Sequence, residues 1–177
     1  SSITGDGAGP PVEHAASSTA MTMRLPWRTA IRSRADPVIT LRIVPLGVDV
    51  SRFSPGPSRE PPGYFLFVGR VRRYKGIPVL LEAWRSLPGT RLVMVGGGPL
   101  EPAIRSASAK PGMDLELPGD VPDDRLVDLY RGATALILPS TERSEAFGMV
   151  QIEAMACGTP VISTDIRTGV PWVNAGG

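Results

Sequence analysis

Several residue types are scarce in this sequence, and each shortage excludes a class of protein. Cys157 is the single cysteine among 177 residues, so no disulfide can form within the chain. The single histidine, His14, and the absence of an Asp-x-Asp triplet leave no pattern for a metal site or a Ser-His-Asp triad. The net charge of +2 is too small to indicate a nucleic-acid partner. We therefore expect neither a metal cofactor nor nucleic-acid binding.

Long apolar segments are also missing. No apolar run approaches the roughly 20 residues that span a membrane, and the first residues lack the apolar core of a signal peptide. Together with the single cysteine, this predicts a reducing, cytoplasmic location. The apolar neighbours of Cys157 favour a buried small residue over a nucleophile.

The rest of the composition is that of a folded chain with one domain. Hydrophobic residues make up 42% and charged residues 20%, which is typical of globular and not of disordered proteins. Residues 1–36 are dominated by small and polar residues and follow neither helical nor strand periodicity, which predicts a flexible or irregular leader. Residues 37–177 are expected to form the domain.

Apolar segments and amphipathic segments alternate along this domain. The expected strands are Val38–Val44, Tyr64–Val68, Arg91–Val95, Met113–Leu117, Ala133–Leu138 and Pro160–Ser163. The expected helices are Gly76–Leu87, Leu100–Ala109, Asp123–Arg131 and Gly148–Cys157. Continuous apolar strands separated by helices predict an α/β fold with a doubly wound, Rossmann-like parallel sheet covered on both faces. Ligands of such sheets bind beyond the carboxyl ends of the strands, so the loops 69–75, 96–99, 118–122 and 139–148 are candidates for the site.

The loop 139–148 leads from a buried strand into a helix. The amides of Gly148, Met149 and Val150 would lack helical acceptors there, and the helix dipole favours an anion such as a phosphate. An ordinary helix start capped by Ser144 is the alternative.

Two glutamates flank this helix start, eight positions apart. If Glu153 faces the crevice, its carboxylate can accept hydrogen bonds from a vicinal diol such as a ribose. Glu145, in the loop, would reach the far side of the phosphates. Both could instead be solvated surface residues, as most glutamates are. The neutral Gln151 between them indicates that one side of the helix tolerates polarity.

Two further loops carry weaker signals. Residues 69–76 read GRVRRYKG and place three arginines and a lysine after a strand, which suits phosphate binding but also describes a solvated basic face. Residues 96–99 read GGGP, which is not a dinucleotide fingerprint. The backbone at Gly97 could approach a flat base or sugar closely, and a tight turn explains the glycines equally well.

Taken together, these residues resemble the donor-binding half of retaining glycosyltransferases of the GT-B fold, in glycosyltransferase family 4 ("glycosyl transferases group 1"). The resemblance covers roughly residues 43–174, and Glu145 and Glu153 fit the family's E-x7-E motif. The matching segments read IVPLGVDVSRF, FVGRVRRYKG, VMVGGGP, LPGDVPDDRLVDLY and LPSTERSEAFGMVQIEAMACGTPVIST.

The resemblance implies a role for each matching charged residue. Arg70 and Lys75 match the pair that holds the donor diphosphate and stabilises the leaving nucleotide. Glu153 matches the residue that binds the ribose hydroxyls, and Glu145 the one that contacts the transferred sugar.

It also implies roles for the main chain. The backbone of Phe147, Gly148, Met149 and Val150 would bind phosphate and sugar hydroxyls, and that of Val121 would contact the base. The family needs no metal or other cofactor, and its donor is a nucleotide-diphosphate sugar.

The function expected from the resemblance is sugar transfer with retention of configuration to a glycan or lipid-linked acceptor. The segment TGVPWVN looks most like transferases of bacterial polysaccharide assembly, with GDP-mannose as a candidate donor. Family members carry a second, acceptor-binding domain, so we expect the present domain to be incomplete and its counterpart to be missing or on another chain. Peripheral membrane association of the full enzyme is expected as well. A nucleotide-sugar-binding module that needs a partner chain, or a GT-B nucleotide-sugar epimerase, remain the alternatives.

Overall fold

The structure of the chain is a computed structural model that describes residues 46–175. These residues fall within one compact unit. The expected leader, the expected strand Val38–Val44 and the domain boundary at residue 37 lie outside the described residues.

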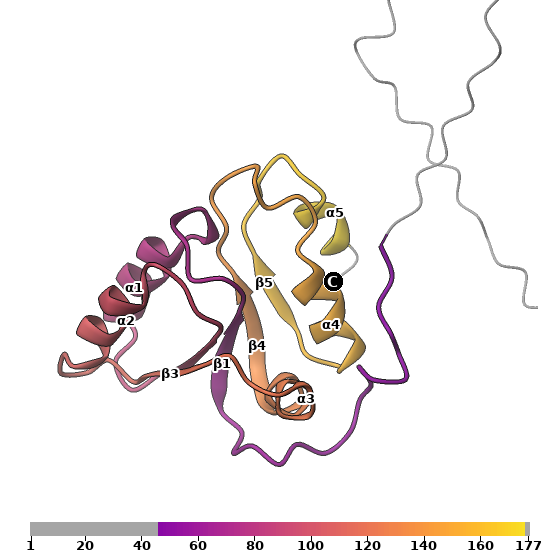
Figure 1. Cartoon of the computed structure of the whole chain (residues 1–177), viewed down its shortest axis with the longest axis horizontal. Helices are drawn as coiled ribbons and strands as arrows, with labels where there is room; N and C mark the ends of the chain where they lie inside the picture. The colour runs from indigo at the N-terminus through magenta and orange to yellow at the C-terminus, as the bar shows by residue number, and fades with distance from the viewer. Residues whose placement is uncertain (1–45, 176–177) are drawn as a thin grey trace, which may run out of the picture. The chain divides into compact units, whose positions relative to one another are not determined.

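Strands and helices alternate along the described residues (Figure 1). The strands are β1 Tyr64–Val68, β2 Arg91–Val95, β3 Leu115–Gly119, β4 Ala133–Leu138 and β5 Val161–Ser163. The α-helices are α1 Ile77–Arg85, α2 Glu101–Ser108, α3 Asp123–Gly132, α4 Met149–Ala156 and α5 Val170–Val173, and a 3-10 helix, η1, spans Arg73–Lys75. The described part of the chain contains no helix long and apolar enough to cross a membrane.

The five strands form one parallel sheet in the order β3-β2-β1-β4-β5. From β1 the chain winds outward through β2 to β3, then returns across the sheet to β4 on the other side of β1. The predicted doubly wound α/β fold is therefore confirmed. The winding direction reverses between β1 and β4, which is where sheets of this kind bind their ligands.

Successive residues of the central strands supply two separate hydrophobic cores, because strand side chains alternate between the faces of the sheet. Phe67 of β1 packs with Met94 of β2 against α1 and α2. Leu66 of β1 packs with Val93 of β2 against α3 and α4. Figure 1 shows the two helix pairs on opposite sides of the sheet.

The strands β1, β2 and β4 have the predicted bounds, whereas β3 begins two residues later than predicted. This strand lies at the edge of the sheet and is only half-buried, so its pattern is mixed, and an edge position also tolerates Pro118. The short η1 and α5 were not predicted, since three or four residues are too few to show a period.

Candidate functional site

The loops at the carboxyl ends of β1, β2 and β4 are hydrogen-bonded to one another. The amide of Val71 donates to the carbonyl of Gly97 over 3.0 Å, and the amide of Thr141 donates to the carbonyl of Tyr74 over 2.9 Å. The basic loop after β1 therefore lies between the glycine loop after β2 and the loop that leads into α4. Three of the four candidate loops share one edge of the sheet, as the predicted topology requires.

A close backbone contact holds the basic loop against the end of β4. Gly76 has a φ of 73°, and a Cβ built on it would lie 1.8 Å from the carbonyl oxygen of Pro139. Only glycine fits at this position, for both conformational and steric reasons. Gly76 is the N-cap of α1 in a left-handed conformation, so the helix begins at Ile77, one residue later than predicted.

Lys75 and Glu145 form an ion pair across these loops. The Lys75 Nζ lies 2.5 Å from Glu145 Oε2, and their side chains are only 12% and 9% exposed. The hydroxyl of Ser140, at the end of β4, donates to the same oxygen over 2.9 Å. The other carboxylate oxygen, Oε1, has no hydrogen bond within the described residues. Glu145 is thus anchored through one oxygen, and the second keeps its capacity to accept a hydrogen bond.

Arg70 lies on the other side of the basic loop, beside a pocket. Its side chain is exposed and forms no ion pair with the described residues. Together with Gly97 and Val121, two of the predicted backbone contacts, it lines a pocket of about 530 Å³. Leu126 of α3 and Asp120 complete the wall toward β3. The loop after β3 thereby joins the same site.

The amino terminus of α4 is open. Gly148 is its N-cap residue, with a φ of 73° and no side-chain hydrogen bond to the helix start, so the alternative of a cap by Ser144 is wrong. Within the described residues, the amides of Met149 and Val150 have no acceptor. Phe147, just before the cap, is half-buried with its ring 6.2 Å from that of Trp172. Two orphan donors at a helix start form the kind of site that attracts a phosphate.

Gln151 does not mark a polar side of α4, contrary to the interpretation of the sequence. The side chain is fully buried, and its Nε2 donates to the carbonyls of Phe147 over 3.1 Å and Val170 over 3.4 Å. Gln151 therefore ties the loop before α4 to α5. Its Oε1 is buried without a partner in the described residues.

Glu153 lies half-buried one turn after the open helix start and is bonded to a buried tyrosine. The hydroxyl of Tyr130, on α3, donates to Glu153 Oε2 over 2.7 Å. Burial and the neighbouring Glu153 carboxylate raise the pKa of Tyr130 far above its usual range, so the phenol stays protonated and donates. As in Glu145, Oε1 of Glu153 accepts no hydrogen bond within the described residues.

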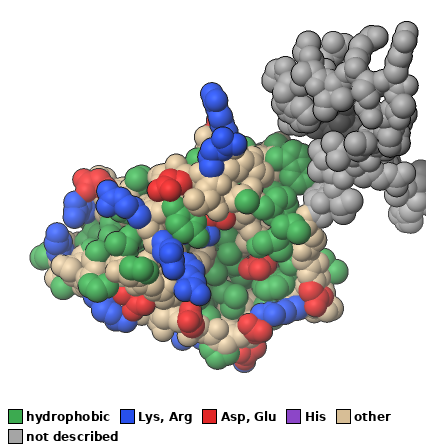
Figure 2. All heavy atoms as spheres, turned by 45° about the horizontal axis from the view of Figure 1, so that its top comes forward, with side chains coloured by type: hydrophobic (Ala, Val, Ile, Leu, Met, Phe, Trp, Pro, Cys, Tyr) green, Lys and Arg blue, Asp and Glu red, His purple; other side chains and the backbone are tan. Residues whose placement is uncertain are grey.

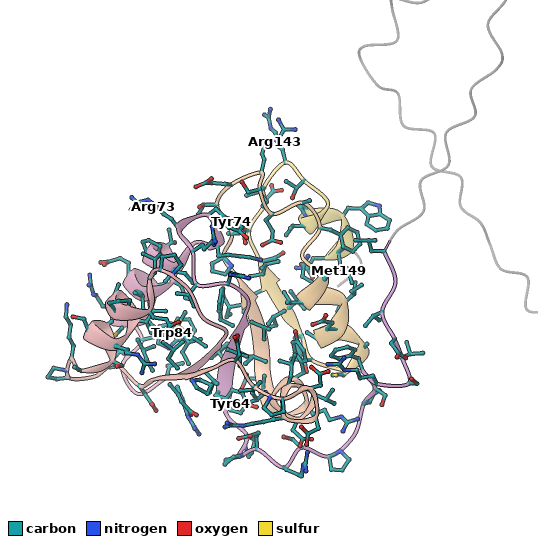
Figure 3. The ribbon with its side chains drawn as sticks, in the orientation of Figure 1. Tyr64, Arg73, Tyr74, Trp84, Arg143 and Met149 are labelled. Carbon is teal, nitrogen blue, oxygen red and sulfur yellow. The ribbon has the colours of Figure 1, made fainter. Side chains whose placement is uncertain are left out.

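Basic loop residues lie near the start of α4. Figure 3 shows Arg73, Tyr74 and Arg143 at the edge of the sheet where α4 begins with Met149, and Figure 2 shows Lys and Arg side chains beside hydrophobic ones on that face. The described residues contain no cluster of three acidic, histidine or cysteine side chains that could hold a metal. The loops at the carboxyl edge of the sheet therefore supply cations, free amides and two carboxylates that are each bonded through one oxygen.

Reasoning from sequence missed Ser140 and Tyr130. Ser140 lies two residues after an apolar strand, and a polar residue just beyond the carboxyl end of a strand is a usable signal. Tyr130 lies in an amphipathic helix, where the sequence pattern predicts an ordinary core residue. Its side chain is indeed fully buried, so the pattern gives no sign of its bond to Glu153.

The sheet order defines a Rossmann-like α/β domain whose candidate ligand-binding loops lie at the carboxyl edge. Residues 51–177 match the family model described as "Glycosyl transferases group 1". The chain belongs to this glycosyltransferase family, which confirms the resemblance at the level of the family. The retaining mechanism and the assignment to the donor-binding half stay predictions.

Relatives with recorded activities agree with this assignment. The chain is 40% identical over 119 residues to D-rhamnosyltransferase WbpZ of Pseudomonas aeruginosa, covering 66% of the chain and 30% of that protein. It is 38% identical over 114 residues to O-antigen chain mannosyltransferase C of Escherichia coli, covering 63% of the chain and 30% of that protein. The chain thus spans about a third of the length of these curated relatives.

Solved structures show the same architecture. The sucrose-phosphate synthase of Thermosynechococcus elongatus superposes with a TM-score of 0.60 at 30% sequence identity, over 74% of this chain and 36% of that one. The GT-B type of parallel-sheet domain predicted from the sequence is therefore supported by both sequence and structure.

Proposed function

We propose that this domain binds the nucleotide-diphosphate sugar of a retaining glycosyltransferase. The diphosphate would lie between Arg70 and the open start of α4, with the ribose at Glu153 and the transferred sugar at Glu145. Because the chain spans a third of its relatives, the proposal for the chain itself is donor binding. Transfer to a glycan or lipid-linked acceptor would need an acceptor-binding domain as well.

One observation carries the proposal: the basic loop and the α4 loop are bonded together at the sheet's switch point. The hydrogen bond from Thr141 to Tyr74 and the ion pair from Lys75 to Glu145 both cross between them. The cations and the orphan amides are therefore carried by neighbouring loops, which supports a diphosphate site between them.

The chemistry follows from these charges. Breaking the bond between sugar and diphosphate builds negative charge on the β-phosphate. Arg70, Lys75 and the α4 amides would stabilise this charge more in the transition state than in the ground state. Glu145, held by Lys75 and Ser140, would position the sugar through its open oxygen and would not act as a nucleophile.

GDP-mannose is the first donor to test. One of the similar proteins is a mannosyltransferase, and the TGVPWVN segment resembles that branch of the family. We expect no metal to be required, since arginine, lysine and helix amides supply the positive charge.

Calorimetry of the 177-residue chain with GDP, UDP and ADP, without divalent metal, tests the proposal. We expect one of the three to bind, and Glu153→Ala to weaken that binding about ten- to a hundredfold, the range of a hydrogen bond to a charged group. Glu142→Ala is the matched control, because Glu142 is exposed on the same loop region and outside the proposed contacts. Absence of binding to all three nucleotides would refute the proposal, and conversion of a bound donor to its epimer would favour an isomerase.

A further inference from the structure

We infer that Tyr130 is a positioning residue that makes the site selective for ribose over deoxyribose. This inference rests on the proposed function, in which Glu153 accepts hydrogen bonds from the ribose hydroxyls. It assigns a role in donor recognition to a tyrosine that is itself buried in the core.

The contact geometry fixes which oxygen of Glu153 is available. Tyr130 donates to Oε2 over 2.7 Å, while Oε1 accepts no hydrogen bond within the described residues and the side chain is half-buried. A carboxylate without such an anchor rotates about its terminal bond and presents either oxygen. With one oxygen held, the other keeps a constant direction, which is what bonding to a vicinal diol demands.

The phenol is itself held from several sides. Its side chain is fully buried, and the ring makes an edge-on contact with Phe53, with 6.0 Å between centroids. The hydroxyl of Thr159 donates to the Tyr130 carbonyl over 2.5 Å. Tyr130 therefore has little freedom to follow Glu153, and the carboxylate must adapt to the tyrosine.

The position of Tyr130 relative to the pocket supports the assignment. Leu126, which lines the pocket beside Arg70, precedes Tyr130 by four residues on α3, so the two share one face of that helix. Val150, one turn before Glu153, packs into the same core as Leu126. The Tyr130–Glu153 bond thus joins α3, which lines the pocket through Leu126, to α4.

The test compares the ribonucleoside and 2′-deoxyribonucleoside forms of whichever diphosphate the chain binds. We expect the wild-type chain to prefer the ribose form about ten- to a hundredfold, since one hydrogen bond to a charged oxygen is lost. Tyr130→Phe removes only the hydroxyl, and we expect the preference to fall to about threefold or less, chiefly through weaker binding of the ribose form. A merely structural tyrosine would weaken both forms in parallel and leave their ratio unchanged.

Tyr64→Phe is the matched control. Tyr64 is equally buried, and its hydroxyl donates over the same 2.7 Å, but to the main-chain carbonyl of Leu129 and not to a carboxylate. This variant should keep the ribose preference of the wild type. If Tyr130→Phe also keeps it, the inference is wrong although donor binding stands. If the wild-type chain binds both forms equally, or binds no nucleotide, the inference fails together with the role of Glu153.

Discussion

Lys75 and Ser140 bond the same carboxylate oxygen of Glu145, from loops that follow two different strands. The ion pair of Lys75 with Glu145 links residues 70 positions apart, and both side chains are nearly closed to solvent. Removing one partner of such a pair leaves a buried charge without compensation, which costs far more than loss of a surface ion pair.

The ion pair gives the first prediction. Lys75→Met and Glu145→Gln should each lower the free energy of unfolding by about 3–5 kcal/mol. The double variant should be more stable than the sum of the two losses implies, because no charge is then left unpaired. Urea denaturation of the four proteins measures this, and strict additivity would show that the two side chains do not interact.

Arg70 should behave differently from Lys75. It is exposed and unpaired among the described residues, so Arg70→Ala should change stability by no more than about 0.5 kcal/mol. Nucleoside diphosphate binding should nevertheless weaken about ten- to a hundredfold, and more at low salt than at high salt. Arg73→Ala, an exposed arginine on the same loop, is the control for charge alone. Equal effects of the two variants would remove the special role of Arg70.

Gly76→Ala should disrupt the edge of the sheet. Its Cβ would meet the carbonyl oxygen of Pro139 at 1.8 Å, so we expect a loss beyond the ~4 kcal/mol that single substitutions seldom exceed. Gly89→Ala is the control, since Gly89 has a φ of 77° but nothing within 4 Å of a built Cβ. It should cost only the conformational strain, about 1–2 kcal/mol. Thermal denaturation measures both variants. If Gly76→Ala and Gly89→Ala lost similar stability, the loop around residue 76 would be able to shift away from Pro139.

Cys157 should resist thiol reagents until the protein unfolds. It is 5% exposed, and burial raises the pKa of its thiol, which lowers the thiolate fraction at neutral pH. Modification at pH 8 should therefore be slow in buffer and fast in denaturing urea. Rapid labelling of the native chain would contradict the packing of α4 described above.

Alkaline pH should destabilise the fold. Burial raises the pKa of both Tyr64 and Tyr130 above the usual value of about 10. Above that pH the unfolded chain releases phenolic protons that the folded chain retains, so stability is complete below pH 10 and falls as the pH rises. Each tyrosine lowers the free energy of unfolding by at most about 1.4 kcal/mol for each pH unit above 10. Urea titrations from pH 8 to 11 should show a smaller decline for Tyr130→Phe.

The sequence predicted those parts of the fold that depend on local pattern. The strands β1, β2 and β4 are mostly apolar and largely buried, and their bounds agree with the structure. The edge strand β3 lacks that pattern, and its predicted start was wrong by two residues. The carboxyl-edge loops followed from topology alone, because every parallel strand ends at the same edge.

Specific side-chain partners could not be predicted in this way. The bonds of Glu145 to Lys75 and of Glu153 to Tyr130 depend on the register between β1, β4 and the helices that cover them. The interpretation of Gln151 was wrong for the same reason, since a polar residue in an apolar helix can be buried against carbonyls of a distant segment. The assigned roles of Arg70, Lys75, Glu145 and Glu153 toward a donor stay predictions.

The pairing of β1 with β4, strands far apart in the chain, has a consequence for folding. Contacts between distant segments form late, because closing the intervening loop costs entropy before any contact compensates for it. The site is assembled from both sides of that pairing, so a partly folded chain with only β1, β2 and β3 docked would hold no donor. Any donor captured by the native chain would then stabilise the whole domain by mass action, and its concentration in the cell would help set how long the protein survives proteolysis.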